Sequence, residues 1–521
     1  MRNSHEAGER SGAAGGAATS SRFFFAIARY ITIPASMLRD LKKLGKETLV
    51  YGLSTVVARL LNFLLLPFHT HYLTQGEYGA VAALFAYMAF FNVAYQYGMD
   101  QAYMRYAVEK DGLSDEDKFS TAFWSLLASS VLFSALLFFS ADTFALWGGL
   151  PGRGTLVRCA AGILLLDALS TLPFADLRLR HRAWLFAAVR SLNIVLTLAL
   201  NVWLLAGLRL GSFGVMLANL VASAATMILL APVAAQWLRP VFKGSLWRSL
   251  LRFALPLVPA GLGSMAVHAI DRPILLHLTD EATVGLYQAN YRLAIVMMLV
   301  VNMFEQAWRP FYLQRSKEPD SGPVFGRVLT YYLAGALWLV LAFSLFMPDI
   351  VRLRLFGVPL IHPDYWAGLG VVPIVLCGEL FYGLYMNFMA SIQLSKRTDV
   401  LPWATLLGAA VKILGTFALV PYWKLLGAAW ATLASYGAMS LMLFFVGRKV
   451  YPIPYERGRV LHLLLAAAAA ASLAYGASVY CSGGLCLLSK AAALLVFPAL
   501  LWATGFLSQD ERDALRRVSR A

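Results

Sequence analysis

Three arginines lie inside stretches of the sequence that are otherwise mainly apolar: Arg59, Arg272 and Arg292. A charged side chain in the middle of a membrane-spanning helix costs about 2.5–3.5 kcal/mol on insertion scales, so each needs a partner or a water-filled cavity. A guanidinium stays charged and can grip two oxygens of a phosphate or carboxylate at once. The three arginines are therefore candidates for an anion-binding site.

An ordinary ion pair is the competing interpretation of these charges. Asp271 adjoins Arg272 in the sequence and is expected at a depth close to that of Arg292, so the acid could simply neutralise them. Arg59 has no such neighbour, and it fits the anion-binding interpretation best. For Arg190 and Lys412 we favour pairing between helices or reaching toward the membrane surface.

Asp271 and four further acids are candidates for gating or for carrying a coupling ion. Asp100 and Glu305 occupy matching positions at the ends of two predicted spans, and each has an arginine nearby, Arg105 and Arg309. These pairs could form an inner gate, although solvated helix ends would look the same. The other two acids, Asp167 and Glu379, lie deep in apolar spans, where hydrogen bonding in a packed core is the alternative role.

The composition excludes most soluble classes of protein. Of the 521 residues, 59% are hydrophobic and only 14% are charged, whereas soluble domains carry about 25% charged residues. The apolar residues come in runs of about twenty, the length that spans a bilayer as a helix. The net charge of +16 is spread over short loops, with no basic face of the kind that binds nucleic acid. No nucleophile with its base, phosphate-binding loop or metal cluster stands out, and the spacing of the four cysteines suggests no zinc site.

The apolar runs and the loop charges together predict the topology. We expect fourteen spans, at about residues 49–70, 78–98, 119–140, 157–177, 184–206, 213–234, 254–277, 285–308, 327–347, 366–391, 400–420, 426–446, 460–480 and 485–507. With the N-terminus inside, 32 of the 44 lysines and arginines fall on the cytoplasmic side and 7 on the other. Because cytoplasmic loops carry an excess of basic residues, both termini are predicted to be cytoplasmic.

An internal repeat divides the chain. Three matching stretches recur in order: Leu73-Thr74, Tyr78-Gly79 and Asp100-Gln101-Ala102, against Leu278-Thr279, Gly285-Leu286-Tyr287 and Glu305-Gln306-Ala307. The repeat unit has six spans, so two pseudo-symmetric six-helix bundles should enclose a substrate path between them. The predicted parts are an N-terminal tail with an interfacial segment (1–45), an N-terminal bundle (46–235), a C-terminal bundle (248–447), helices 13 and 14 (460–507) and a C-terminal tail (508–521).

Several of these stretches also resemble a known family. They are Ser54-Thr-x-x-Ala58-Arg59-x-x-Asn62-Phe63, Leu73-Thr-x-x-Glu77-Tyr78-Gly79, and Asp271-Arg272-Pro-Ile-Leu-Leu followed by Val284-Gly285-x-Tyr287. Together they resemble the polysaccharide transporter family, the Wzx-type oligosaccharide flippases of the MOP exporter superfamily, over roughly residues 45–450. The similarity implies alternating access by two six-helix bundles.

The resemblance also implies a function. The expected substrate is an undecaprenyl-diphosphate-linked oligosaccharide, moved from the cytoplasmic to the periplasmic leaflet of a bacterial inner membrane for surface polysaccharide assembly. Cavity arginines, with Arg59 the best match, would bind the diphosphate. No cofactor is expected, and H+ and Na+ are the candidate coupling ions. A polysaccharide polymerase and a chain-length regulator are the candidate protein partners, beside membrane lipids.

Three other functions stay open from the sequence. A cation-coupled drug exporter or a lipid II flippase of the same superfamily would share the architecture. A membrane glycosyltransferase or polymerase is less well supported, because the longest outer loop, at about 348–365, has its two aspartates well apart. The sequence does not identify the sugar, the oligomeric state, the role of helices 13 and 14, or whether Cys481 and Cys486 form a disulfide.

Overall fold

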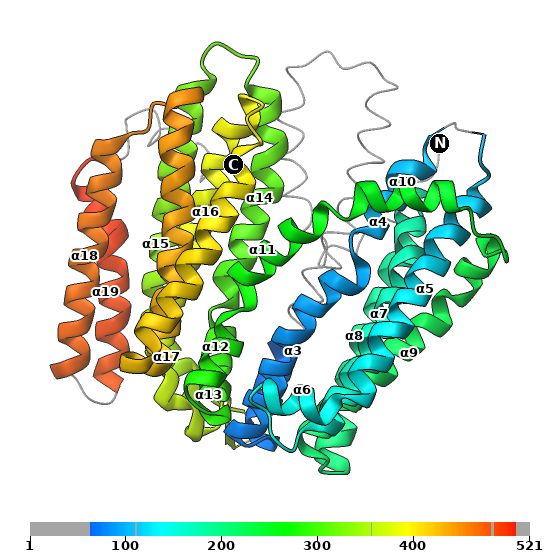
Figure 1. Cartoon of the computed structure of the whole chain (residues 1–521). Helices are drawn as coiled ribbons and strands as arrows, with labels where there is room; N and C mark the ends of the chain where they lie inside the picture. Colours follow the sequence, from blue (N-terminus) through cyan, green and yellow to red (C-terminus); the bar gives the residue numbers. More distant parts are fainter. Residues whose placement is uncertain (1–62, 110–111, 356, 481–483, 507–521) are drawn as a thin grey trace, which may run out of the picture. The chain divides into compact units, whose positions relative to one another are not determined.

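The computed structural model (Figure 1) describes residues 63–109, 112–355, 357–480 and 484–506. These residues are almost entirely helical, apart from a short antiparallel ribbon of β1 (Arg354–Leu355) and β2 (Val358–Pro359). Among the described residues, nine helices are long and apolar enough to cross a membrane, or up to ten if one bent pair counts as a span. The predicted class, an all-α polytopic membrane protein, is confirmed.

The helices follow the predicted spans in order. The N-terminal half contains α3 (Gln75–Gln96), α4 (Met99–Ala107), α5 (Asp115–Phe139), α6 (Ala141–Trp147), α7 (Gly154–Leu179), α8 (Ala183–Val202), η2 (Trp203–Gly207) and α9 (Gly211–Trp237). The remainder contains α10 (Gly244–Ala254), α11 (Leu257–Ala269), α12 (Asp271–Leu278), α13 (Glu281–Leu293), α14 (Ile295–Arg315), α15 (Ser321–Arg352), η3 (Pro363–Gly368), α16 (Val371–Leu394), α17 (Val400–Val450), α18 (Arg457–Tyr480) and α19 (Gly484–Ala503). Residues 63–72, the described part of the first span, are also helical.

The repeat is visible in how two helices begin. At the start of α3, the Thr74 side chain accepts a hydrogen bond from the backbone N–H of Glu77, whose carboxylate accepts one from the backbone N–H of Thr74. At the start of α13, the Asp280 side chain caps the helix by accepting from the N–H of Thr283. Both caps satisfy N–H groups that a helix leaves free at its first turn. Both repeat copies therefore begin this helix with a side-chain N-cap, and α3 adds the reciprocal bond of a capping box.

Two predicted spans are wrong as single helices. The span expected at 254–277 is divided at Leu255–Pro256 and again at Ile270, between α11 and α12. The first break follows from Pro256, which lacks the N–H that would continue the helix. The span expected at 285–308 bends by 47° between α13 and α14, at Ala294. By contrast, the expected turn between spans 11 and 12 is present within α17 at Lys424, whose φ of 46° is not helical.

Between the two halves runs α10, an amphipathic helix. Its buried residues Leu246, Leu250 and Ala254 recur every fourth position and so lie along one face. That face packs on α4 and α5. Just before the helix, the Lys243 ammonium pairs with the Asp117 carboxylate at 2.7 Å. The connection between the repeats is therefore attached to the N-terminal half.

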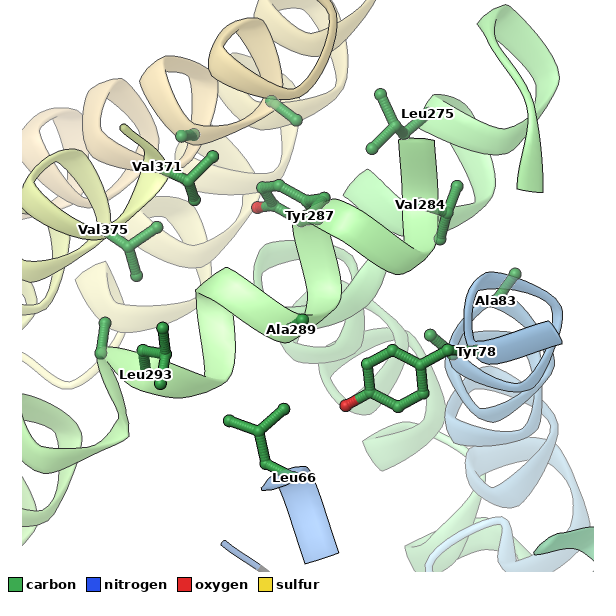
Figure 2. Packing of buried hydrophobic residues seen from close by; sticks show 14 of the residues in the cluster. Leu66, Tyr78, Ala83, Leu275, Val284, Tyr287, Ala289, Leu293, Val371 and Val375 are labelled. Atoms are coloured by element: carbon green, nitrogen blue, oxygen red, sulfur yellow. The ribbon is translucent and has the colours of Figure 1, made fainter. Parts of the chain in front are cut away.

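A single hydrophobic cluster includes residues from both repeat copies. Tyr78 on α3 and Tyr287 on α13 are almost completely buried in it, together with Leu275 of α12 and Val371 of α16 (Figure 2). The contact between α3 and α13 is among the most extensive between any two helices of the described residues. The cluster therefore fixes α3 against α12 and α13, the segments that carry the candidate cations.

Candidate functional site

A pocket of about 250 Å³ lies where α3 meets α11, α12 and α13. Its charged and polar lining residues are His69, Tyr78, His268, Arg272, Gln288 and Arg292. The apolar remainder of the wall comes mainly from α3. The structure thus brings together two of the three predicted cavity arginines, from two adjoining helices of the second repeat. We call this space the central pocket. The third arginine, Arg59, lies outside the described residues.

Arg272 is firmly held within the protein. Its guanidinium donates hydrogen bonds to the Asp271 carboxylate (2.8 Å), the Gln288 side-chain oxygen (3.0 Å) and the backbone oxygen of His268 (2.8 Å). The ring of Tyr291 lies 4.4 Å from the guanidinium carbon. Only 8% of the residue is exposed. Arg272 therefore borders the pocket with most of its donors already used, and the ion pair with Asp271 is present.

Asp271 is the centre of a wholly buried charge cluster. Its second carboxylate oxygen accepts a hydrogen bond from the Tyr287 hydroxyl at 2.7 Å and lies 3.3 Å from the Lys412 ammonium. Lys412 also donates to the backbone oxygen of Val267 at 2.7 Å. Neither Asp271 nor Lys412 is exposed. A buried charge is tolerated only when paired and hydrogen-bonded, so this arrangement ties α12 to α11 and α17.

Arg292 has fewer hydrogen-bond partners than Arg272. It occupies the last turn of α13, next to the bend at Ala294. One of its terminal nitrogens, Nη1, is buried and has no hydrogen-bond partner among the described residues. The Tyr78 hydroxyl and the Nδ1 atom of His69, which line the same pocket, are likewise buried and make no hydrogen bond of standard geometry there, and the Tyr78 side chain interacts with the Arg292 guanidinium. Three polar atoms around one pocket are thus available to a ligand.

His69 and Tyr78 were not singled out as anion-binding residues from the sequence. His69 is buried, and its Nε2 lies 3.1 Å from the side-chain oxygen of Asn201. That bond fixes the ring so that Nδ1 is left over. The partners are 132 positions apart in the chain, so no local pattern could have indicated the contact. Tyr78 could have been noticed only through its place beside the repeated glycine.

The expected partner of Asp100 is wrong. Arg105 pairs with Glu109 one helical turn away, at 2.6 Å, while Asp100 lies 3.5 Å from Arg178 on α7. The reason is geometric, because residues four apart share a helix face and residues five apart do not. Asp100 therefore connects α4 to α7 within the N-terminal half.

The equivalent acid of the second half, Glu305, makes no ion pair with Arg309 or any other described residue. Glu379 on α16 is 3% exposed and lies near Lys412, so it belongs to the buried charge cluster. These two acids are consequently in different surroundings, and neither lines the central pocket. The structure does not bring the predicted acids together into one group.

Asp167 lines a second pocket, of about 530 Å³, inside the N-terminal half between α3, α7, α8 and α9. Its carboxylate accepts a hydrogen bond from the Ser223 hydroxyl at 2.8 Å. Arg190, on α8, lines the same space. We call it the N-half pocket. Among the described residues, no group of three or more His, Cys, Asp or Glu side chains could hold a metal ion.

Comparison with known proteins agrees with this architecture. Residues 71–320 match a sequence family described as polysaccharide biosynthesis protein. The structure is similar to the lipid II flippase MurJ in an inward closed conformation, with a TM-score of 0.68 and 13% identity, over 88% of this chain and 100% of that one. This chain has the MOP exporter fold. The resemblance to the polysaccharide transporters that was inferred from the sequence is confirmed by the family match and by the fold.

Multidrug transporters share the MOP exporter fold. An inward-facing MATE family transporter matches with a TM-score of 0.60 and 14% identity, over 75% of this chain and 94% of that one. An outward-facing MATE transporter matches with a TM-score of 0.56 and 14% identity, over 78% and 95%. No curated protein matches the sequence. The apolar helices and the fold make this chain a multi-pass membrane protein, with a fold that these transporters and the flippase share.

Proposed function

We propose that the chain translocates an undecaprenyl-diphosphate-linked oligosaccharide from the cytoplasmic to the periplasmic leaflet of a bacterial inner membrane. The observation that carries this proposal is the unpartnered Arg292 nitrogen in a pocket that also contains Arg272. A diphosphate is the anion that such a pair of guanidinium groups suits, because a guanidinium can donate hydrogen bonds to two phosphate oxygens at once. The match to polysaccharide biosynthesis proteins supports a carbohydrate-bearing substrate.

The two arginines have different roles in this mechanism. Arg272, already bonded to Asp271, supplies a fixed positive field with little reorganisation when the substrate arrives. Arg292 supplies the free donors, with the Tyr78 hydroxyl and His69 beside it. A carrier must release its substrate, and a site with one free guanidinium binds more weakly than a dense cluster of cations. One fixed and one free guanidinium therefore suit binding followed by release, which transport requires.

The proposal also covers the orientation of the chain, its coupling ion and its protein partners. The charge bias of the loops supports a cytoplasmic position for both termini. The chain acts as a carrier and not as an enzyme, with H+ or Na+ as coupling ion and Asp167 as one acid placed to bind it. A polymerase and a chain-length regulator would use the translocated substrate at the outer face.

The proposal is tested by deleting the gene in its host and extracting lipid-linked oligosaccharides. The lipid should accumulate and stay protected from a membrane-impermeant glycosidase in right-side-out spheroplasts. Wild-type protein should restore cleavage, Arg292→Gln should restore little, and Arg158→Gln, a loop-side control paired with Asp142, should restore it fully. Full access of the glycosidase in the deletion strain would contradict the proposal.

A drug exporter is the second candidate, because MATE transporters share the fold. It predicts unchanged glycans and altered tolerance to cationic drugs in the deletion strain. A lipid II flippase predicts instead that the chain replaces such a protein in a depleted strain. Either result would redirect the assignment without changing the fold.

A further inference from the structure

The N-half pocket has no place in the diphosphate chemistry described above, and its lining is unlike that of the central pocket. Its charges are balanced, since Asp100 and Arg178 form one pair and Asp167 lies near Arg190. The central pocket is lined by two arginines and no acid. A net-neutral space disfavours a free anion but accepts an uncharged polar molecule. The two pockets are therefore suited to different parts of a ligand.

Side-chain amides give the N-half pocket fixed hydrogen-bonding groups. The Asn193 amide nitrogen donates to the Thr226 hydroxyl at 2.8 Å and to the Ala222 oxygen, which leaves its carbonyl oxygen available. The Asn219 nitrogen donates to Val215 in its own helix, again leaving the oxygen. Each amide is thus held at one end and presents the other. Such an array matches hydroxyl groups, which both donate and accept.

The part of the N-half pocket that α3 forms also carries side-chain amides, those of Asn92 and Gln96. Gln96 donates to the Asn92 side-chain oxygen at 3.3 Å, so the Asn92 nitrogen and the Gln96 oxygen have no hydrogen-bond partner among the described residues. On α7 and α8, the ring centroids of Phe174 and Phe186 lie 5.2 Å apart, with an interplanar angle of 68°. Apolar ring faces beside a few fixed polar groups are typical of a small-molecule site. The C–H face of a pyranose ring packs on such an aromatic surface.

The corresponding acid and base of the second half are buried. Spans 4 and 5 of each half carry one acid and one base, Asp167 with Arg190 and Glu379 with Lys412. Lys412 is 0% exposed and bonded, whereas Arg190 is exposed and its guanidinium contacts the Phe174 ring at 4.5 Å without any hydrogen-bond acceptor among the described residues. Both halves therefore keep one acid and one base at these positions, and in the first half the two residues line a pocket.

The two pockets are neighbours along α3. Phe85 and Ala89 line both of them. A ligand whose anionic group binds Arg292 can therefore extend past these two residues into the N-half pocket. We propose that the N-half pocket is the carbohydrate subsite of the transporter, which binds the sugars next to the diphosphate. This inference rests on the proposed function and adds to it where the sugar is recognised.

The test measures binding to the full-length protein in nanodiscs, by native mass spectrometry titration. The two probes are undecaprenyl diphosphate, which has no sugar, and the lipid-linked oligosaccharide extracted from the deletion strain. Asn219→Leu removes one amide from the pocket wall. It should weaken binding of the oligosaccharide lipid about fivefold, the loss of one net hydrogen bond, and leave undecaprenyl diphosphate unchanged. Asn92→Leu, on α3, is the second variant and should do the same.

A matched control is available in α14. The Asn302 amide nitrogen donates to the backbone oxygen of Met298, one turn back, as Asn219 does to Val215, but Asn302 lines neither pocket. Asn302→Leu should therefore leave the affinity for both probes unchanged. The inference is overturned if Asn219→Leu and Asn92→Leu behave like this control, or if they weaken both probes equally.

Failure of the proposed function has a different signature. Arg292→Gln should weaken both probes together, because both carry the diphosphate. If the wild-type protein binds neither probe, or if Arg292→Gln changes neither affinity, the diphosphate assignment fails and the carbohydrate subsite fails with it. If Arg292→Gln acts on both probes but the two asparagine variants act on neither, only the subsite is overturned.

Discussion

Gly79 of α3 and Gly285 of α13 stand at matching positions of the repeat, and the backbone of each helix fills the space that a side chain on the other would need. A Cβ atom on Gly79 would overlap the carbonyl oxygen of Glu281, and one on Gly285 would overlap that of Gln75. In each helix the obstructing carbonyl lies one turn before the glycine. The contact therefore obeys the pseudo-two-fold symmetry, at the end of the helices that the loop charges predict to be the outer one.

This symmetric crossing is expected to close the outer side of the substrate path. Replacing Gly79 with Ala should prevent the helices from meeting, since the overlap is with backbone atoms that cannot move aside alone. We expect transport to fall at least tenfold while the protein stays folded. Spin labels on Tyr72→Cys and Leu278→Cys, both exposed positions near this crossing, should report a longer distance in the variant.

Gly335 provides the control for that substitution. It lies inside α15, and a Cβ there would meet no atom within 4 Å. Gly335→Ala should leave transport and the label distance unchanged and stabilise the helix slightly, because alanine loses less backbone freedom than glycine. Equal transport by both alanine variants would contradict a gating role for the crossing.

An ion pair reinforces the same outer contact. Arg153, between α6 and α7, lies 2.9 Å from Glu281 in the first turn of α13, and both side chains are partly exposed. Glu281→Gln should favour opening by less than about 1 kcal/mol, the usual range for an exposed pair. The label distance across the outer side measures this shift. The exchanged pair Arg153→Glu with Glu281→Arg should recover part of the closed population.

The nearby pair of Arg158 and Asp142 serves as its control, because both residues belong to the first half. Asp142→Asn should not change the label distance. An equal shift for Asp142→Asn and Glu281→Gln would show a general effect of surface charge and not a contact between the halves.

The sequence predicted the spans well because each depends on local composition. The runs of apolar residues and the basic loops located most of the long helices from α3 onward, and the turn at Lys424 falls in the predicted gap, whereas the short helices α6 and α10 were not predicted. The repeat was found because Gly79 and Gly285 carry recognisable neighbours. The bend at Ala294 was missed, since no proline or glycine marks it and packing against other helices sets its position.

The site was predicted less completely, because its chemistry depends on contacts between distant residues. Asp271 and Arg272 are adjacent in sequence, so their pairing could be considered in advance. Whether Arg292 has a partner could not be predicted from the sequence, because that depends on which side chains of α3, such as Tyr78, lie beside it. Likewise, Asp100 reaches Arg178, 78 positions away, instead of the nearby Arg105. Residue types indicated the candidates, but only the packing shows which charges remain available.

Neutralising the two pocket arginines should have different effects: the Arg272 variant should lose stability, and the Arg292 variant should lose transport. Arg272→Gln removes hydrogen bonds to Asp271 and to the His268 backbone, so it should destabilise the protein by on the order of 3 kcal/mol. Arg292→Gln removes a side chain whose Nη1 has no partner among the described residues, so the melting temperature should change little while transport falls. Thermal unfolding and lipid translocation, measured on the same preparations, separate the two effects. A large loss of stability in Arg292→Gln would remove the distinction on which its ligand role rests.

Burial should decide how much each membrane lysine contributes to stability. Lys412 pairs with Asp271 where neither side chain is exposed, whereas the Lys490 ammonium lies 2.6 Å from the Asp349 carboxylate with 10% and 31% of the side chains exposed. Lys412→Met leaves the Asp271 carboxylate and the Val267 carbonyl short of a donor, and should cost about 3 kcal/mol of unfolding free energy. Lys490→Met keeps a similar side-chain length and should cost about 1 kcal/mol or less, because water can replace the lost partner of Asp349. Equal melting temperatures for the two variants would mean that the buried cluster does not hold α11, α12 and α17 together, and that the fixed field assigned to Arg272 has another support.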